Sequence, residues 1–292
     1  MEFLDGVFLP IVTPFLDGEL DMESYVRLLR HYADAGISGV IPLGTTGEAP
    51  TIDEEESRTV IEATIETVGS RIPIYIGVSS NSTRKAVHWI EELNRYPVEG
   101  YLVTSPYYNL PSQAGIYDHF AALAESTDRH LLIYNIPYRT GRNVENETVF
   151  RLSEIENIVG IKDSCGNIAH TAELIRDRAH GFSVLTGEDA LFYFNLAAGG
   201  NGGILASAHI STPQFLRIHE LVRQNNHRAA LDLWNPLSRM IPLFFKEPNP
   251  APIKYLLAEM GLIRSAEVRA PLAPISDAPQ GALREIVTAA NP

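Results

Sequence analysis

Short apolar segments alternate with amphipathic stretches eight times between residues 6 and 224, and this alternation restricts the possible folds more than any other feature. The apolar segments have the length of buried strands, and the stretches that follow place apolar residues at helical spacing. The expected strands cover residues 6–13, 38–43, 73–78, 100–104, 131–134, 158–161, 183–186 and 203–206. Eight strand-then-helix units with brief connections predict an α/β fold in which a parallel sheet closes into a (β/α)8 TIM barrel.

A doubly wound open sheet is the alternative arrangement of strand-then-helix units. Such a sheet usually carries a Gly-x-Gly-x-x-Gly turn after its first strand, whereas Thr13-Pro14-Phe15 follows the first strand here. The barrel is therefore favoured, and we assign it to residues 1–224. Residues 225–292 contain amphipathic stretches at 228–240 and 253–260, which predict a C-terminal helical extension.

Two helix starts carry local signals. Thr51 and Glu54 have the spacing of a capping box, in which each side chain satisfies a free amide of the first turn. Thr212 is followed by a proline, which is favoured at the first helical position. We expect helices to begin at these two threonines.

Composition and charge exclude several classes of protein. A formal net charge of -13 argues against a nucleic-acid surface, which needs clustered Lys and Arg. No apolar run reaches the ~18 residues of a membrane span, and the first residues lack the basic start of a signal peptide. The single cysteine, Cys165, rules out an internal disulfide, is typical of a reducing compartment, and is interpreted as a packing residue. We expect a cytoplasmic protein that binds neither nucleic acid nor membrane.

The expected sixth strand, 158–161, ends in Lys162. Lysine is rarely buried without a partner or a purpose, because its ammonium group loses hydration. Burial at the carboxyl end of a barrel strand would lower the pKa and leave some neutral amine as a nucleophile. On this segment alone, a lysine that extends its ammonium group into solvent is the favoured interpretation.

The other strand ends supply hydroxyl, phenol and guanidinium groups, and barrel enzymes place their chemistry at these ends. The segments are Gly44–Glu48, Ser105–Asn109, Tyr134–Gly141 and Gly187–Asp189. One lysine with neutral proton carriers and donors for carboxylates suits an imine-forming aldolase. The nine histidines show no His-x-x-x-His spacing, so no metal site is expected. The glycine-rich segment 199–203 precedes a strand and is interpreted as a structural turn, not a phosphate site.

Three motifs, taken in order, carry a family resemblance. They are Gly44-Thr45-Thr46-Gly47-Glu48, Tyr134-Asn135-Ile136-Pro137 and Gly160-Ile161-Lys162-Asp163. Together they resemble the dihydrodipicolinate synthase and N-acetylneuraminate lyase superfamily, and the resemblance extends through Glu247–Pro250 to essentially the whole chain. It implies that Lys162 forms a Schiff base with pyruvate. The interpretation of Lys162 as a lysine that extends into solvent is therefore replaced by that of a buried nucleophile.

The resemblance also implies roles for the other residues of the site. Tyr134 would pass protons during imine formation and ring closure, with Thr45 and Tyr108 as its relay partners. Tyr107 would reach or line the interface of a tight dimer. Family members place one of these two tyrosines in the neighbour's site, and Tyr108 is favoured for the relay.

Further positions are implied to hold the substrates. Thr46 would grip the pyruvate carboxylate, and Gly187 and Ile204 would line the pocket. Arg139 resembles the arginine by which the synthases bind the carboxylate of aspartate semialdehyde, and a planar guanidinium can hold that group with two hydrogen bonds. Tyr138, which precedes Arg139, departs from the family pattern, in which a small residue usually occupies this position.

The implied reaction is the condensation of pyruvate with L-aspartate 4-semialdehyde to 4-hydroxy-tetrahydrodipicolinate, in lysine and diaminopimelate biosynthesis. No cofactor is implied, because pyruvate is held covalently on Lys162, and the implied assembly is a homotetramer of tight dimers. The alternative is a sister pyruvate-dependent lyase that acts on a keto-sugar acid or another 2-oxo acid. A non-catalytic barrel that senses small acids is a third hypothesis.

Many relatives are inhibited by lysine at a site between subunits. The matching positions here are Ala49, Glu54, Ser57, Asn81, Lys85 and Tyr107. Where such relatives carry a glutamate for the ammonium group of the effector, this chain has Lys85. A like charge opposes a cationic effector, so we expect weak or absent feedback by lysine.

Overall fold

The computed structural model describes the backbone of residues 4–290 and the side chains of residues 4–284. The chain divides into two compact units. The middle unit consists of Pro73–Ile204 and the short segment that ends at Gly6. The terminal unit consists of Val7–Ile72 and the chain from Leu205 onward.

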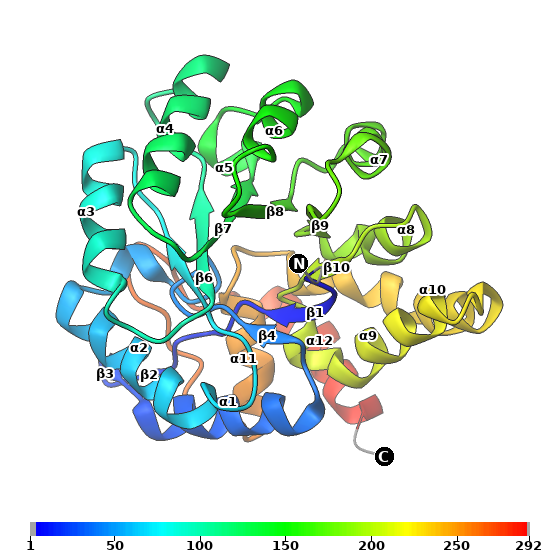
Figure 1. The fold of residues 1–292 in the computed structure, drawn as a ribbon. Helices are drawn as coiled ribbons and strands as arrows, with labels where there is room; N and C mark the ends of the chain where they lie inside the picture. The colour runs from blue at the N-terminus through cyan, green and yellow to red at the C-terminus, as the bar shows by residue number, and fades with distance from the viewer. Residues whose placement is uncertain (1–3, 291–292) are drawn as a thin grey trace. The chain divides into compact units, whose positions relative to one another are not determined.

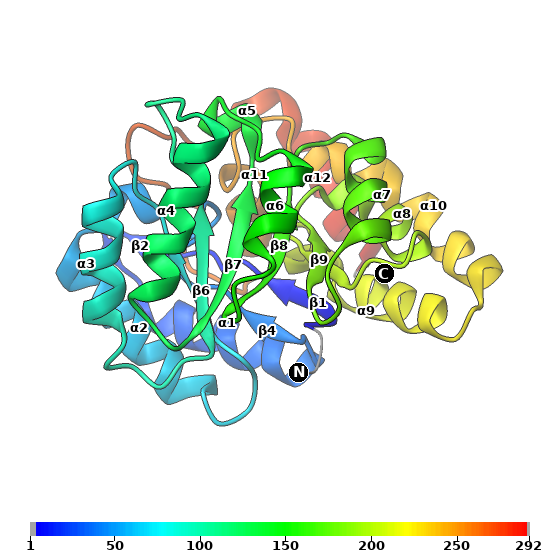
Figure 2. The same ribbon diagram turned by 45° about the horizontal axis from the view of Figure 1, so that its top comes forward.

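The middle unit contains six strands that pair in succession. They are β5 (Tyr75–Val78), β6 (Gly100–Thr104), β7 (His130–Asn135), β8 (Ile158–Asp163), β9 (Ser183–Thr186) and β10 (Gly202–Ile204). Its helices are α3 (Thr83–Leu93), α4 (Gln113–Glu125), α5 (Pro137–Thr140), α6 (Asn146–Leu152), α7 (Ile168–Asp177) and α8 (Phe192–Ala197), with a 3-10 turn, η2 (Asp189–Leu191), before α8. Figures 1 and 2 show α3, α4 and α6 as neighbours along one face of these strands.

The terminal unit contains two parallel strands, a hairpin and most of the long helices. The parallel strands are β1 (Gly6–Leu9) and β4 (Gly39–Val40), and the hairpin pairs β2 (Phe15–Leu16) with β3 (Glu19–Leu20). The helices are α1 (Met22–Ala35), α2 (Glu54–Val68), α9 (Ala208–Arg223), α10 (His227–Phe244), α11 (Ala251–Glu259) and α12 (Asp277–Ala290), with a 3-10 turn, η1 (Ala49–Thr51), before α2. The C-terminal helices confirm the expected helical extension.

Within residues 4–290, eight strands lie outside the hairpin β2–β3, namely β1 and β4 in the terminal unit and β5 to β10 in the middle unit. The pairing of β1 with β4 and the successive pairings from β5 to β10 are parallel. Each strand is followed along the chain by at least one helix. This repeat confirms the (β/α)8 barrel. The division at residue 224 stays a prediction.

Strands β7 and β8 set the position of the predicted nucleophile. Their register places Tyr134 opposite Lys162 and Asn135 opposite Asp163. Gly160 allows β8 to approach β9, because a Cβ atom there would lie 2.6 Å from the carbonyl oxygen of Ser183. All residues of β8 are buried, as expected for a strand of a parallel sheet that is covered on both faces.

Some strands are shorter than the sequence predicts. The expected strand 6–13 is reduced to Gly6–Leu9, and the expected strand 38–43 is reduced to Gly39–Val40. Backbone hydrogen bonds from the amide of Ile41 to the carbonyl of Leu9 and from the amide of Ile11 to the carbonyl of Ile41 continue the pairing of the two segments just beyond these ends. The hairpin β2–β3 was not predicted, although its Asp17-Gly18 turn has positive φ at both residues and is a known hairpin signal.

The predicted capping box at Thr51 and Glu54 is wrong by two residues. Asp53 caps α2 by accepting a hydrogen bond from the amide of Glu56, whose carboxylate accepts one from the amide of Asp53. Thr51 instead belongs to η1, and its hydroxyl donates to the carbonyl of Glu48. At Thr212 the prediction holds in part, because α9 begins at Ala208 but is interrupted by non-helical geometry just before Thr212.

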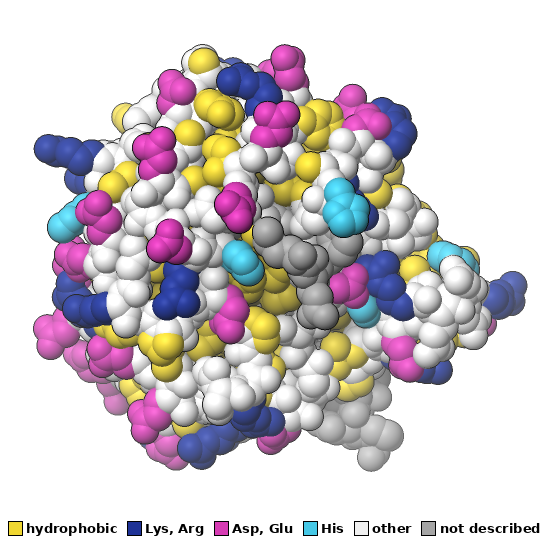
Figure 3. All heavy atoms as spheres, in the orientation of Figure 1, with side chains coloured by type: hydrophobic (Ala, Val, Ile, Leu, Met, Phe, Trp, Pro, Cys, Tyr) yellow, Lys and Arg dark blue, Asp and Glu magenta, His cyan; other side chains and the backbone are white. Residues whose placement is uncertain are grey.

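Among the helices of residues 4–290, none combines the length and the apolar composition that crossing a membrane requires. On the face that Figure 3 shows, acidic and basic side chains are interspersed. That mixture does not resemble the continuous basic surface of a nucleic-acid-binding protein.

Candidate active site

Lys162 lies at the carboxyl end of β8, and its side chain is only 5 % exposed. Its Nζ atom lies 4.1 Å from the ring centroid of Tyr134, over the face of the ring. Tyr134 lies opposite on β7 and is also buried. The predicted nucleophile and the predicted proton carrier are therefore adjacent, and the interpretation of Lys162 as a solvent-exposed lysine is wrong.

Burial lowers the pKa of Lys162 to about 8. The carboxylates of Asp189 and Glu188 oppose this effect and raise the pKa, whereas the guanidinium of Arg139 lowers it further. An amine with such a pKa is about one-tenth neutral at pH 7, far more than an exposed lysine. Lys162 can therefore act as a nucleophile near neutral pH.

Gly187 packs directly against the Lys162 side chain. A Cβ atom at this position would lie 2.5 Å from Cε of Lys162 and 2.1 Å from Oγ of Ser164. The amide of Gly187 also donates a hydrogen bond to the carbonyl of Asp163, at 2.7 Å. Only glycine leaves room for the lysine, so the predicted pocket-lining position is adjacent to the reactive amine.

Glu188 and Asp189 follow Gly187 and were not among the predicted site residues. Burial raises the pKa of Glu188 to about 7, the neighbouring Asp189 raises it too, and Lys162 lowers it. Glu188 is therefore an acid that titrates near neutral pH and is coupled to the nucleophile. Its position at the carboxyl end of a barrel strand was the available signal.

Arg139 lies in the short helix α5, directly after β7. Its guanidinium carbon lies 5.6 Å from the ring centroid of Tyr138, and both side chains are exposed. The hydroxyl of Thr140 anchors this turn by donating to the carbonyl of Arg142 at 2.9 Å, and the carbonyl of Ile136 lies 3.2 Å away. Because its charge lowers the pKa of Lys162, Arg139 acts on the same site electrostatically.

The two tyrosines after β6 differ in exposure. Tyr108 is 86 % exposed and has a positive φ of 72°, whereas Tyr107 is partly buried. The side chain of Asn109 anchors the loop by donating to the carbonyl of Asn81. The positive φ presents the Tyr108 ring to solvent in this single chain.

The terminal unit carries the two predicted threonines in the loop Gly44–Glu48. Thr45 is partly buried, and Thr46 is 3 % exposed. The loop is turned by backbone hydrogen bonds from Gly47 to Gly44 and from Glu48 to Thr45. Ile204, the remaining predicted position, is buried at the end of β10 in the middle unit.

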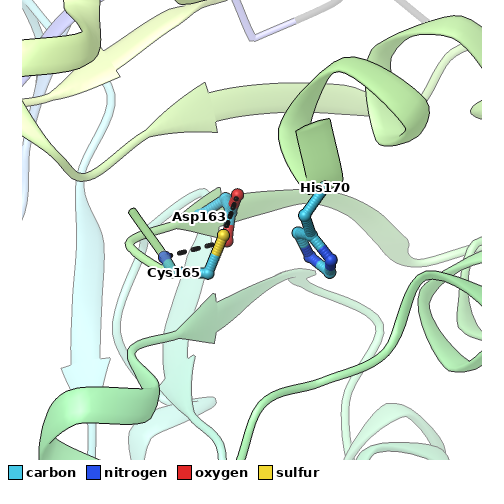
Figure 4. Close-up of side chains that lie close together, drawn as sticks. All are labelled: Asp163, Cys165 and His170. Carbon is cyan, nitrogen blue, oxygen red and sulfur yellow. Dashed lines mark hydrogen bonds between the residues drawn. The ribbon is translucent and has the colours of Figure 1, made fainter. Parts of the chain in front are cut away.

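Asp163, Cys165 and His170 form a cluster beside the end of β8 (Figure 4). The Asp163 carboxylate accepts hydrogen bonds from Nδ2 of Asn135, from the hydroxyl of Thr171, and from both the amide and the thiol of Cys165. Burial and Asp163 raise the pKa of the thiol to about 12, so it stays protonated. The cluster is therefore a hydrogen-bonded turn that leads into α7, and the expectation of no metal site stays a prediction.

Comparison with known proteins places this geometry in a family. Residues 3–290 match the model of the dihydrodipicolinate synthetase family. The chain belongs to this family. It is 49% identical, over 274 residues, to a Clostridium acetobutylicum member named 4-hydroxy-tetrahydrodipicolinate synthase 2, with 94% of this chain and 96% of the relative covered.

Solved structures of family members share the fold over nearly the whole chain. One, described as a monomeric dihydrodipicolinate synthase variant, has a TM-score of 0.94 at 35% identity and covers 98% of this chain and 96% of its own. Another, from Cyanidioschyzon merolae with lysine bound, has a TM-score of 0.95 at 32% identity and covers 99% of both chains. These values confirm the predicted family and fold.

Proposed function

We propose that this enzyme condenses pyruvate with L-aspartate 4-semialdehyde to give 4-hydroxy-tetrahydrodipicolinate, a step of lysine and diaminopimelate biosynthesis. The observation that carries the proposal is the buried Lys162 amine over the ring of Tyr134, in a chain of this family. A neutral amine can add to the carbonyl of a keto acid, and an adjacent phenol can pass the protons that imine formation requires.

The reaction begins when the neutral amine of Lys162 adds to the C2 carbonyl of pyruvate, and loss of water gives the imine. Loss of a C3 proton gives the enamine, whose C3 attacks the aldehyde carbon of the second substrate. The amine of that substrate then attacks the imine carbon, which closes the ring and releases Lys162. No cofactor is required, because the lysine itself carries pyruvate through these steps.

We assign the proton transfers to Tyr134, with Thr45 and Tyr108 as relay partners. The register of β7 against β8 supports the assignment of Tyr134, because it places the phenol-bearing residue beside the lysine. The 86 % exposure of Tyr108 supports its assignment as the tyrosine that enters the site of a neighbouring subunit, with Tyr107 lining the interface.

We assign substrate binding to the remaining predicted positions. Thr46 binds the pyruvate carboxylate, Arg139 binds the carboxylate of the semialdehyde, and Gly187 and Ile204 line the pocket. The electrostatic effect of Arg139 on Lys162 supports its place in this set. The alternative, a lyase acting on a keto-sugar acid, differs only in what Arg139 and its neighbours bind.

We also infer a homotetramer in the cytoplasm. Ile168 and Phe194 are exposed apolar side chains that line the same hollow, which supports self-association because exposed apolar patches often mark interfaces. The free Cys165 fits a reducing compartment. Because one structural relative is described as monomeric, sedimentation velocity is the deciding measurement for the assembly.

Feedback by lysine is expected to be weak or absent. Lys85 lies exposed on α3, at the position where lysine-inhibited relatives carry a glutamate for the effector's ammonium group. A clear saturable inhibition curve below millimolar lysine would contradict this expectation. Lys85→Glu is the matched variant, and it should gain lysine sensitivity.

Three measurements test the function. Borohydride reduction in the presence of pyruvate should add a pyruvate-derived mass to the peptide that contains Lys162, and an unmodified peptide would overturn the proposal. A coupled assay should show turnover of aspartate semialdehyde in preference to cleavage of sialic acid or keto-sugar acids. Arg139→Ala should remove most semialdehyde turnover while largely preserving imine formation.

A further inference from the structure

The loop Gly44–Glu48 is held at two points by the segment in which α11 begins. The amide Nδ2 of Asn249 donates a hydrogen bond to Oγ1 of Thr46 at 2.9 Å. Five residues later, Nζ of Lys254 donates to Oε1 of Glu48 at 2.6 Å. All four residues belong to the terminal unit, so one short segment restrains both ends of Thr46-Gly47-Glu48.

Glu48 has a left-handed backbone, with φ 56° and ψ 31°, which is unfavourable for a residue with a side chain. Its two carboxylate oxygens are both used. Oε1 accepts from Lys254, and Oε2 accepts from the backbone amide of Arg269 at 3.0 Å. The carboxylate thus holds in place a backbone conformation that the loop would not adopt alone.

Lys254 is as fully buried as its partner, since both side chains are 0% exposed. The ring of Phe15 also lies against this amine, with its centroid 4.2 Å from Nζ. Separating the two charges would leave each of them buried without its counter-charge, which is strongly unfavourable. The segment that carries Asn249 and Lys254 therefore cannot move independently of the loop.

The hydrogen bond between Asn249 and Thr46 has a direction. A threonine hydroxyl has one hydrogen to donate and two acceptor positions. Because Nδ2 of Asn249 can only donate, Oγ1 of Thr46 is the acceptor. The hydroxyl hydrogen of Thr46 is then kept for another acceptor, such as a carboxylate oxygen.

We propose that Asn249 is a positioning residue for pyruvate binding: its donated hydrogen bond makes Thr46 a donor to the pyruvate carboxylate, while the Glu48–Lys254 ion pair holds the loop. The inference rests on the proposed function, in which Thr46 binds that carboxylate. It makes the C-terminal extension part of the machinery for substrate recognition.

Asn249→Asp tests the direction of the hydrogen bond, because an ionised aspartate of the same shape accepts a hydrogen bond where Asn249 donates one. The Thr46 hydroxyl would then donate to Asp and be lost to the substrate. We expect the KM for pyruvate, and the pyruvate concentration for half-maximal borohydride trapping, to rise about tenfold or more, as for a lost hydrogen bond to a charged group. Asn249→Ala should give a smaller rise, because the hydroxyl hydrogen stays available but is no longer directed.

Asn235→Asp is the matched control, because Asn235 is an exposed residue of α10 in the same C-terminal region. It introduces the same charge and should leave the KM for pyruvate unchanged. For both Asn249 variants, the KM for the semialdehyde and the midpoint of chemical unfolding should match those of the wild-type enzyme. A proportional rise in both KM values with a lowered midpoint would show a purely structural role and overturn the inference.

A double-mutant cycle separates this inference from the function on which it rests. Thr46→Val should raise the KM for pyruvate, and adding Asn249→Asp to it should raise the KM no further. If Thr46→Val leaves pyruvate binding intact, the assignment of Thr46 under the proposed function fails. If Thr46→Val weakens binding and Asn249→Asp has its full effect in that background, or no effect in the wild type, the positioning role alone fails.

Discussion

Lys162 of the middle unit and Lys254 of the terminal unit are both buried, and burial lowers the pKa of each to about 8. Their surroundings differ. Nζ of Lys254 donates to the Glu48 carboxylate at 2.6 Å, whereas Nζ of Lys162 lies over the ring of Tyr134. A lowered pKa therefore does not by itself identify a nucleophile. The lysine with a carboxylate in contact serves structure, and the lysine over a phenol ring stays available for chemistry.

The two lysine side chains also differ in the groups that surround them. Gly187 leaves room along the Lys162 side chain, and a methyl group there would collide with Cε. Lys254 instead lies between the Glu48 carboxylate and the face of the Phe15 ring. Three measurements test this difference between the two lysines.

Removing the Lys162 amine should have the strongest effect on activity. Lys162→Ala should lower kcat/KM for pyruvate at least about a thousandfold, because the nucleophile is lost, and should abolish borohydride trapping. Lys254→Met, assayed under conditions in which it is folded, should still form the adduct on Lys162. A trapped adduct on the peptide that contains Lys254 would contradict the comparison directly.

The second effect concerns stability. Lys254→Met should lower the free energy of unfolding by about 3–5 kcal/mol, because it leaves the Glu48 carboxylate buried without its partner. The double variant Glu48→Gln with Lys254→Met should recover much of that loss, since no charge remains buried. Urea unfolding of the single and double variants measures the coupling, and simply additive losses would show that the pair is not a unit.

The smallest effect is a shift in pH dependence. Only the neutral amine attacks pyruvate, so the rate of imine formation should rise with pH and level off above about 8, the pKa of Lys162. The Glu188 carboxylate raises that pKa; Glu188→Gln should therefore move the midpoint to lower pH, by up to about one unit. Glu91→Gln, an exposed change of equal charge on α3, should not move it. A midpoint that shifts upward in Glu188→Gln would contradict the electrostatic assignment.

The sequence predicts the barrel and the reactive pair because both depend on local patterns. The eightfold alternation indicates the strands, and two neighbouring strands carry Tyr134 and Lys162 near their carboxyl ends, at the same edge of the sheet. The predicted bounds of some strands and helices were wrong where the local sequence also favoured another arrangement. Two strands end before their apolar segments do, and Asp53 replaced Thr51 as the cap of α2.

Other features could not be predicted because they join residues that are distant in the chain. Glu48 and Lys254 are 206 positions apart, and nothing in the motif Gly44–Glu48 indicates its partner. The same is true of Asn249, which lies 203 positions from Thr46. The acidic pair Glu188 and Asp189 was visible at a strand end, but its coupling to Lys162 depends on burial.

The Glu48–Lys254 contact also has a consequence for synthesis of the chain. Translation proceeds from the N-terminus, and domains tend to fold in that order, yet the carboxylate at position 48 receives its counter-charge only after a further 206 residues have been added. The loop that carries Thr45 and Thr46 is thus completed late, when most of the polypeptide has left the ribosome. A nascent chain stalled before residue 254 would contain the Glu48 carboxylate without the Lys254 ammonium group that neutralises it.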